Sequence, residues 1–131
     1  LNKMKLELKH LAPYLPYALK IQGITHGEIA ELSCCTETSV NITTRSFQYG
    51  MWADIFDIKP ILRPLSDLTK EINMDGDMVS AYEILPRREK EDYKNPIIGY
   101  WSWDAMQILF EWHFDVFGLI ELGLAIDKNT L

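Results

Sequence analysis

The chain has 131 residues, of which 47% are hydrophobic and 24% are charged. These values match globular averages and exclude an intrinsically disordered chain, so we expect a single globular domain over residues 1–131. The net charge of −6 disfavours general nucleic-acid binding, because a phosphate-binding surface needs clustered Lys and Arg, although a local basic patch stays compatible with it.

The N-terminal part predicts a short helix and then a strand. Pro13 and Pro16 forbid a long helix in Leu8–Tyr17, which predicts one helical turn followed by an extended exit. Tyr17–Gln22 continues as a predicted strand, and Gly23 supplies turn chemistry after it. Leu1 is not a translation start, whereas Met4 could serve as one, which would make residues 1–3 a processing or expression remnant.

Two further segments predict strands. Glu28–Cys35 alternates imperfectly between apolar and polar residues, which fits a strand with a bulge or a short helix, and we favour the strand. Ser39–Thr44 is rich in β-branched residues, which are typical of strands. Together with the preceding strand, these segments predict an antiparallel sheet or meander.

The middle of the chain predicts a mixture of short elements. Pro60 and Pro64 limit Ile55–Leu65 to an edge strand or an extended connection. Ser66 is a suitable N-cap for a helix over DLTKEI, and Met74–Asp77 predicts a turn.

Two segments follow that turn. Val79–Leu85 fits a strand or a short helix equally well. Pro86–Asn95 interleaves acids with bases and predicts a mobile loop.

The C-terminal part predicts a long apolar helix that starts at Ser102 or Asp104. We expect a kink or break near Asp115–Gly118 and a stop at Gly123. Trp103 is expected to broaden the apolar face. The residues predicted to share that face are Ala105, Ile108, Leu109, Trp112, Val116, Leu119 and Ile120.

The predicted helix is not a membrane span. Glu111, Asp115 and Glu121 lie inside Met106–Ile126, and each acid at mid-membrane costs roughly 2.5–3.5 kcal/mol on insertion scales. The fold class that we expect is therefore α+β, with a small antiparallel sheet from the N-terminal half packed against C-terminal helices. Because such a sheet covers only one side of the helix, we favour a homodimer over a monomer.

No catalytic signature emerges from the polar residues. His10, His26 and His113 match no zinc-binding spacing, so buried, hydrogen-bonded histidines are favoured over metal ligands. Cys34 and Cys35 are adjacent, which disfavours a disulfide between them and indicates a reduced, cytoplasmic setting. One of them could act with His26 as nucleophile and base, but a small buried hydrophobe is favoured.

Two acidic pairs raise the question of a cation site. Asp54 with Asp57, or Asp75 with Asp77, could act as acid and base or hold a divalent cation, but INMDGDMV lacks the further ligands of a calcium loop. We assign no catalytic residue, no metal and no cofactor.

Aromatic residues supply the one candidate for a binding surface. They are numerous enough to form a contact patch for a protein partner, since aromatics are enriched at interfaces. The residues proposed for that patch are Tyr14, Tyr17, Phe47, Tyr49 and Trp52.

Three stretches together resemble a group of uncharacterised small proteins of Bacteroidota phages and prophages. They are LKHLAPYLPYALK, IKPILRPLSDLTKEI and LFEWHFDVFGLIELGLAID, and they cover about a third of the chain in the same order. The segment Gly23–Ala53 does not take part. The resemblance implies a phage setting in the bacterial cytoplasm and supplies no catalytic residues.

Two functions follow as hypotheses. The first is a non-enzymatic phage or prophage accessory protein that binds a host or phage protein, with nucleic-acid mimicry by an acidic surface as a narrower version. The second is a metal-dependent or nucleic-acid-processing enzyme that uses scattered carboxylates and a histidine. Carboxylates that converge in one pocket would favour the enzyme, and an exposed aromatic patch would favour the binder.

Overall fold

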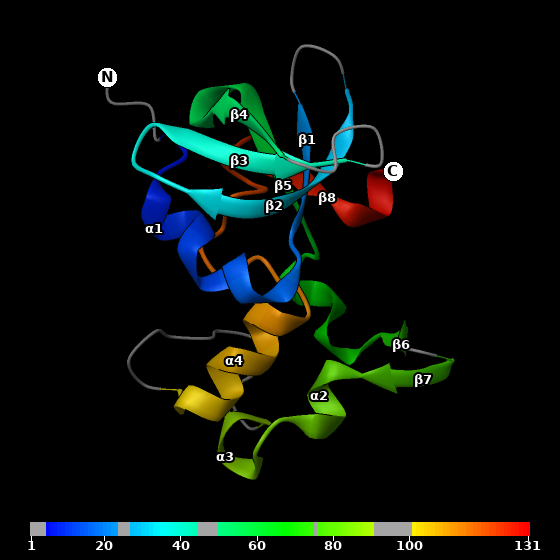
Figure 1. The fold of residues 1–131 in the computed structure, drawn as a ribbon. Coiled ribbons are helices and arrows are strands. Elements are labelled where there is room, and N and C mark those ends of the chain that lie inside the picture. Colours follow the sequence, from blue (N-terminus) through cyan, green and yellow to red (C-terminus); the bar gives the residue numbers. More distant parts are fainter. Residues whose placement is uncertain (1–4, 24–26, 45–49, 75, 91–100) are drawn as a thin grey trace.

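The computed structural model describes residues 5–23, 27–44, 50–74, 76–90 and 101–131. Figure 1 shows a sheet in its upper part, and helices with a small hairpin in its lower part. We call residues 5–62 and 117–131 the sheet half and residues 63–116 the helical half. Within the described ranges, no helix is long and apolar enough to cross a membrane.

The sheet half is built on a six-stranded sheet in the order β4-β3-β2-β1-β5-β8. The α+β fold class is confirmed, but the sheet is larger than predicted. Its neighbours pair antiparallel except β5 and β8, which are parallel. The strands are β1 (Lys20–Gly23), β2 (Ile29–Cys35), β3 (Ser39–Thr43), β4 (Met51–Asp54), β5 (Ile58–Leu62) and β8 (Ile126–Asp127).

The predictions for β2 and β3 are confirmed. β2 is a strand with a register irregularity between Leu32 and Cys34, which is the bulge that its broken alternation indicated. β5 is not a sheet edge, because it pairs with β1 and β8. β8 pairs with Ile61 and Leu62, the two residues that follow Pro60. Pro60, which has no N–H to donate to a ladder, pairs with Ile21 of β1.

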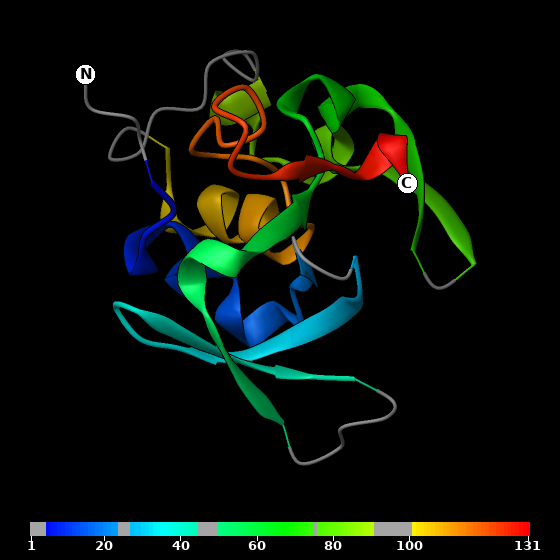
Figure 2. The same cartoon turned by 90° about the horizontal axis from the view of Figure 1, so that it is seen from above.

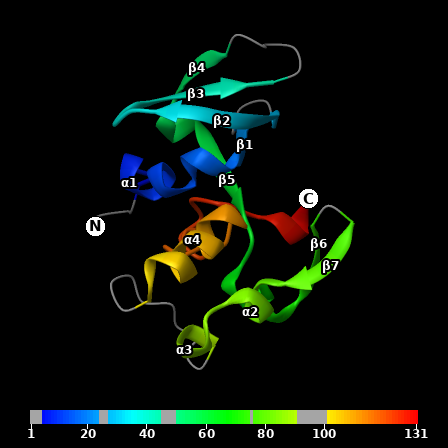
Figure 3. The ribbon, with the colours of Figure 1, turned by 60° about the horizontal axis from the view of Figure 1, so that its bottom comes forward.

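Two short helical elements precede the sheet. α1 (Leu8–Leu11) is the predicted turn of helix, but the predicted extended exit is wrong, because η1 (Ala12–Tyr17) is a 3-10 helix. Pro13 is tolerated near the start of η1, where a helix leaves its N–H groups unpaired. Figures 2 and 3 show η1 between strands β2 and β3 on one side and α4 (Trp103–Glu111) on the other.

The first part of the helical half differs from its prediction. The predicted helix after Ser66 is wrong: η3 (Leu65–Thr69) is one 3-10 element, and β6 (Glu71–Met74) follows it. β6 pairs with β7 (Asp77–Ser80) across the predicted turn, where Gly76 adopts φ +95°.

The segment after the hairpin resolves one ambiguity and corrects one prediction. Ser80 ends β7 and caps α2 (Ala81–Ile84), so Val79–Leu85 contains both a strand end and a helix. The first part of the predicted loop is instead α3 (Arg87–Lys90), and residues 91–95 lie outside the described ranges. Glu89 of α3 is buried, and its Oε1 accepts a hydrogen bond of 2.8 Å from the Ser102 N–H.

α4 starts as predicted and ends early. Ser102 caps it by accepting from the Ala105 N–H at 3.2 Å, but the helix stops at Glu111, and His113 adopts φ +62°. The Asp115 carboxylate then accepts from the N–H groups of Leu119 and Ile120, which folds this segment into a loop rather than a helix.

This early end changes what the helix exposes. Val116, Leu119 and Ile120 do not lie on α4, and Trp103 is 76% exposed, so its predicted place on the buried face is wrong. The reason for expecting a homodimer was the surface of a long helix, and α4 has nine residues. The homodimer itself stays a prediction.

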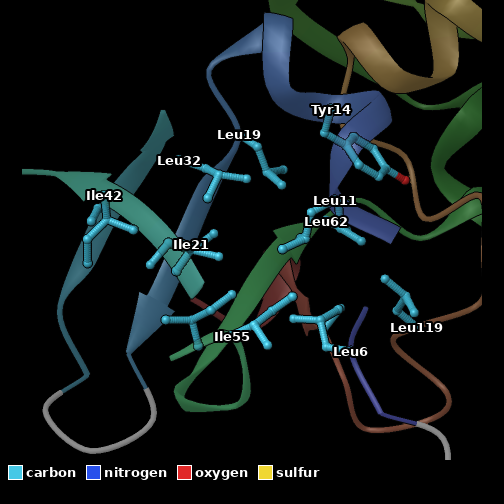
Figure 4. Packing of buried hydrophobic residues seen from close by; sticks show 14 residues of the cluster. Leu6, Leu11, Tyr14, Leu19, Ile21, Leu32, Ile42, Ile55, Leu62 and Leu119 are labelled. Atoms are coloured by element: carbon cyan, nitrogen blue, oxygen red, sulfur yellow. The ribbon is translucent and has the colours of Figure 1, made fainter. Parts of the chain in front are cut away.

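Two hydrophobic clusters form the core. Figure 4 shows side chains from the strands converging with Leu11 of α1 and Tyr14 of η1 in the sheet half. The second cluster surrounds α4, and Phe110 packs against both clusters. The buried members of the second cluster are Leu68, Ala81, Leu85, Trp101, Ala105, Met106, Leu109, Trp112 and Phe114.

A hydrogen-bonded seam joins the two halves. Arg63 follows β5 and pairs with Phe114: its N–H donates to the His113 carbonyl at 2.7 Å, and its carbonyl accepts from the Asp115 N–H at 2.8 Å. The buried Tyr14 hydroxyl donates to the Phe114 carbonyl. The seam therefore satisfies the backbone of the chain that leaves α4.

Candidate functional site

Strand β4 lies at the end of the sheet order and presents apolar side chains to solvent. It pairs with β3 in the register Ser39↔Asp54 to Ile42↔Met51. Trp52 is 58% exposed and Met51 is 39% exposed. Figure 3 shows β4 at the outer margin of the sheet. An edge strand has one row of N–H and C=O groups without a ladder partner, so β4 can accept another strand.

A glycine with a positive φ directly precedes β4. Gly50 adopts φ +85°, a backbone conformation that residues other than glycine rarely adopt. A Cβ atom at Gly50 would lie 2.4 Å from the Asn41 side-chain oxygen. That oxygen accepts a hydrogen bond of 2.8 Å from the Ser33 hydroxyl, so β2, β3 and β4 meet at this point.

A hollow of about 250 Å³ adjoins β4, and we call it the edge hollow. Its floor is apolar and its border carries two carboxylates, Glu28 and Asp57. Its lining residues are Gly23, Glu28, Ala30, Ile42, Met51, Ala53, Asp57 and Ile58.

The turn between β4 and β5 contributes Asp57 to the lining of this hollow. Asp54 accepts a hydrogen bond of 2.8 Å from the Phe56 N–H and so caps η2 (Ile55–Asp57). Ile55 is buried and anchors the turn in the core, whereas Phe56 is 51% exposed, with Lys5 Nζ 5.5 Å from its ring centre. The turn carries the chain away from β4 before β5 starts.

The structure separates the five aromatic residues that the sequence proposed as a contact surface. Tyr14 is fully buried, so its place on an exposed surface is wrong. Tyr17 is half-buried, and its carbonyl lies 2.6 Å from His113 Nε2. Trp52 is exposed on β4. Phe47 and Tyr49 lie outside the described residues.

Met51 and Phe56 are exposed residues that the sequence reasoning missed. The segment Met51–Asp54 received no strand assignment, since its four residues are too few for a period-two pattern to stand out. The adjacent apolar residues Met51 and Trp52 are the available signal in the sequence. The exposure of Met51 depends on β4 being the last strand of the sheet, and Phe56 is exposed on η2.

The two described histidines have separate structural partners. His10 is buried, its Nδ1 accepts from the Glu7 N–H at 3.0 Å, and its ring packs against Phe117. Burial lowers the pKa of His10 and of His113, which favours the neutral ring in both. His26 lies outside the described residues.

The described cysteine and acidic side chains do not lie together in one site. Cys34 is exposed, whereas Cys35 packs against the core, and burial raises the pKa of the Cys35 thiol, which disfavours the nucleophilic thiolate. Among the residues that the structure describes, no group of three or more His, Cys, Asp or Glu side chains could hold a metal ion. Asp75, of one proposed acidic pair, lies outside them.

Comparison with known proteins gives no match for this chain among protein-family models, curated proteins or solved structures. The candidate site therefore rests on the geometry of β4 and the edge hollow.

Proposed function

We propose that this chain is a non-enzymatic binding module that recognises an extended segment of another protein at strand β4. The observation that carries the proposal is the juxtaposition of an exposed edge strand and an apolar hollow at the same margin of the sheet. The enzyme alternative stays a prediction without a supporting observation among the described residues.

Main-chain pairing supplies the first part of the recognition. A segment that adds to β4 would pair with the N–H and C=O groups that point away from β3, as in strand-addition complexes. β4 has four residues, so about four residues of the partner would take part. Such a short edge also limits uncontrolled pairing with other strands.

The edge hollow supplies the second part. Met51 and Ala53 face the same side of β4 and both line the hollow. Alternate residues of an added strand would face that side too, so one apolar side chain could enter the hollow. Its volume of about 250 Å³ has room for one apolar side chain.

Charge complementarity defines the segment further. Glu28 and Asp57 border the hollow, and the whole chain carries a net charge of −6. A Lys or Arg next to the inserted apolar residue would complement these carboxylates. Trp52 faces the opposite side of β4 and offers a large contact area of the type that dominates interface energies.

The sequence resemblance adds a setting to this proposal. A phage or prophage accessory protein would meet its partner, a host or phage protein, in the bacterial cytoplasm. This part of the proposal rests on the three resembling stretches and is independent of the geometry of β4.

A selection of displayed random peptides on the immobilised full chain tests the proposed function. We expect the selected peptides to combine an apolar residue with a neighbouring Lys or Arg. Ala53→Phe fills the hollow and should weaken their binding at least about tenfold, which corresponds to about 1.4 kcal/mol. Trp52→Ala should weaken it as well.

The control is Trp103→Ala, because Trp103 is exposed on α4 in the helical half. It should bind the selected peptides as the unmodified chain does. Peptides that bind the Ala53→Phe variant with unchanged affinity would overturn the site, and so would selection of acidic peptides.

A further inference from the structure

A group of cationic side chains gathers on the opposite side of the sheet half from its core, in a chain that is acidic overall. Lys20 and Lys59 alternate with the buried residues Ile21 and Pro60, so they lie on the outer face of β1 and β5. Figure 1 shows β8 and the C-terminal turn beside β5 at this place. We call this surface the basic face.

The parallel pairing of β5 with β8 brings two more cations to this face. Ile61 pairs with Ile126 and Leu62 with Asp127, so the next residues, Arg63 and Lys128, leave the two strands together. Burial lowers the pKa of Lys128, and the nearby charges of Arg63 and Lys20 lower it further. The register agrees with this placement, since Lys20 directly precedes the Ile21↔Pro60 pair and Arg63 and Lys128 directly follow the Leu62↔Asp127 pair.

Asp67 is the acid that acts on these cations: burial lowers the pKa of Arg63, and the charge of Asp67 partly offsets that lowering. Asp67 accepts from Asn129 Nδ2 at 2.6 Å and pairs with Lys70 Nζ at 3.0 Å. Lys128 Nζ has no carboxylate within 4.0 Å among the described residues.

Two cations of the face have protein partners. Lys20 pairs with Glu31 at 3.2 Å in an exposed ion pair, and water screens such a pair so that it opens readily. Arg63 Nε donates to the Trp112 carbonyl at 3.0 Å, which fixes the guanidinium and leaves its two terminal nitrogens for an anion.

An outer hollow of about 330 Å³ lies beside Lys59, whereas Lys20, Arg63 and Lys128 do not line it. Gln22, Lys59 and Ile126 line it together with Gly23 and Gly27. Lys20 and Gln22 are two residues apart on the same face of β1, so the hollow and the cations form one continuous surface.

We propose that the basic face binds a small phosphate-bearing molecule, with its phosphate held by Arg63, Lys128 and Lys20 and its remaining part in the outer hollow. Arg63 supplies a planar fork of donors, and the two lysines supply point charges. This site is distinct from β4 and does not depend on the proposed binding of a protein segment.

Nuclear magnetic resonance titration of the full chain tests the proposal. Inorganic phosphate at near-neutral pH should shift the amide signals of Arg63 and Lys128, and it should raise the pKa of His113, because Lys128, Arg63 and Lys20 all now lower it. Phenyl phosphate should bind more tightly than inorganic phosphate. Chloride at equal ionic strength should reproduce neither change.

The decisive variant is Lys128→Gln, which should weaken phosphate binding about fivefold, the equivalent of one moderate ion pair. Lys9→Gln is the matched control, since Lys9 is an exposed lysine of α1 in an ion pair with Glu7, and it should leave the affinity unchanged. Equal losses in the two variants, or equal affinity for phosphate and phenyl phosphate, would overturn the site. Absence of any phosphate-dependent shift would do the same.

Discussion

The sheet half and the helical half bury their apolar side chains in different ways. In the sheet half, strands contribute inward residues at alternate positions, such as Ile21 on β1 or Val40 and Ile42 on β3. In the helical half, one nine-residue helix meets single side chains from short elements, such as Leu68 of η3 and Ala81 of α2.

The contrast has an energetic consequence. Strands of the sheet half share ladders of hydrogen bonds, so a lost side chain leaves the backbone pairing in place. α2 and α3 have four residues each, and isolated helices shorter than about 12–15 residues are marginal in water. The helical half therefore depends on side-chain packing around α4 and on the seam that joins it to the sheet half.

Truncation of Trp112 should have the largest effect on this contrast. Trp112 is 8% exposed in the cluster around α4, and truncating a large buried aromatic costs about 3–5 kcal/mol. We expect Trp112→Ala to lower the free energy of unfolding by that amount in urea denaturation. Trp103→Ala, at an exposed position of the same region, should change it by less than about 0.5 kcal/mol. An unchanged unfolding midpoint in Trp112→Ala would contradict the packed helical core.

Removal of one hydroxyl tests whether the seam couples the halves. Tyr14→Phe deletes the hydroxyl that donates to the buried Phe114 carbonyl and accepts from the Val116 N–H. These two backbone groups still bond each other at 3.0 Å, so the loss is that of a net hydrogen bond, about 0.5–1.5 kcal/mol. Fluorine labels on Trp52 and Trp112 should report one shared midpoint in the unmodified chain and two midpoints in the variant.

The control for the seam is Tyr17→Phe in the same 3-10 helix. Tyr17 contacts His113 through its main-chain carbonyl, so loss of the ring hydroxyl should preserve the shared midpoint. Coincident midpoints in Tyr14→Phe would mean that other contacts couple the halves.

Two glycine substitutions compare the sheet edge with the hairpin of the helical half. Gly50 and Gly76 both have positive φ, but a Cβ at Gly50 would meet the Asn41 side chain, and a Cβ at Gly76 would meet no atom within 4 Å. Backbone strain of this kind costs about 1–3 kcal/mol. We expect Gly50→Ala to destabilise more than Gly76→Ala and to speed hydrogen exchange in β4. Equal effects would mean that Asn41 moves aside freely.

Acid should weaken the seam through His113. Burial is the main reason that the folded pKa of His113 lies below its ordinary value, and Lys128 and Arg63 add to the effect. The folded state therefore favours the neutral ring. Its stabilisation is complete above the unfolded value of about 6.5 and is lost as the pH falls from there towards the lowered folded value.

The measurement is the melting temperature between about pH 7.5 and about pH 5. The decline on acidification should be smaller in His113→Asn, because asparagine tolerates the positive φ of this position but does not titrate. His10→Gln should remove a separate share of the decline, since its pKa is also lowered. A decline in His113→Asn as steep as that of the unmodified chain would exclude His113 as a source.

The cysteine substitutions should have the smallest effect. Cys34 is exposed, and Cys35 packs at the margin of the sheet cluster, so replacing both by Ala removes little buried volume. We expect peptide binding at β4 to stay unchanged and the loss of stability to remain well below that of Trp112→Ala. An intermolecular disulfide in the native protein would contradict this prediction.

The sequence by itself determined the elements whose signals are local. The bulged β2 and the β-branched β3 followed from their side-chain patterns, and the turn at Gly76 followed from its composition. The start of α4 followed from Ser102, because a cap acts through hydrogen bonds to residues next to it. The exclusion of a membrane helix followed from the acids in the apolar stretch.

Tertiary structure decided the end of α4 and the place of each aromatic residue. The stretch after Glu111 has a helical apolar period, but backbone pairing with Arg63 and capping by Asp115 stabilise a loop there instead. Packing in the cluster of the sheet half buries Tyr14, and the position of β4 at the end of the sheet order exposes Trp52. Local periodicity carries no information about the contacts of Arg63 with Trp112 or of Tyr14 with Phe114, since these join residues about 50 to 100 positions apart.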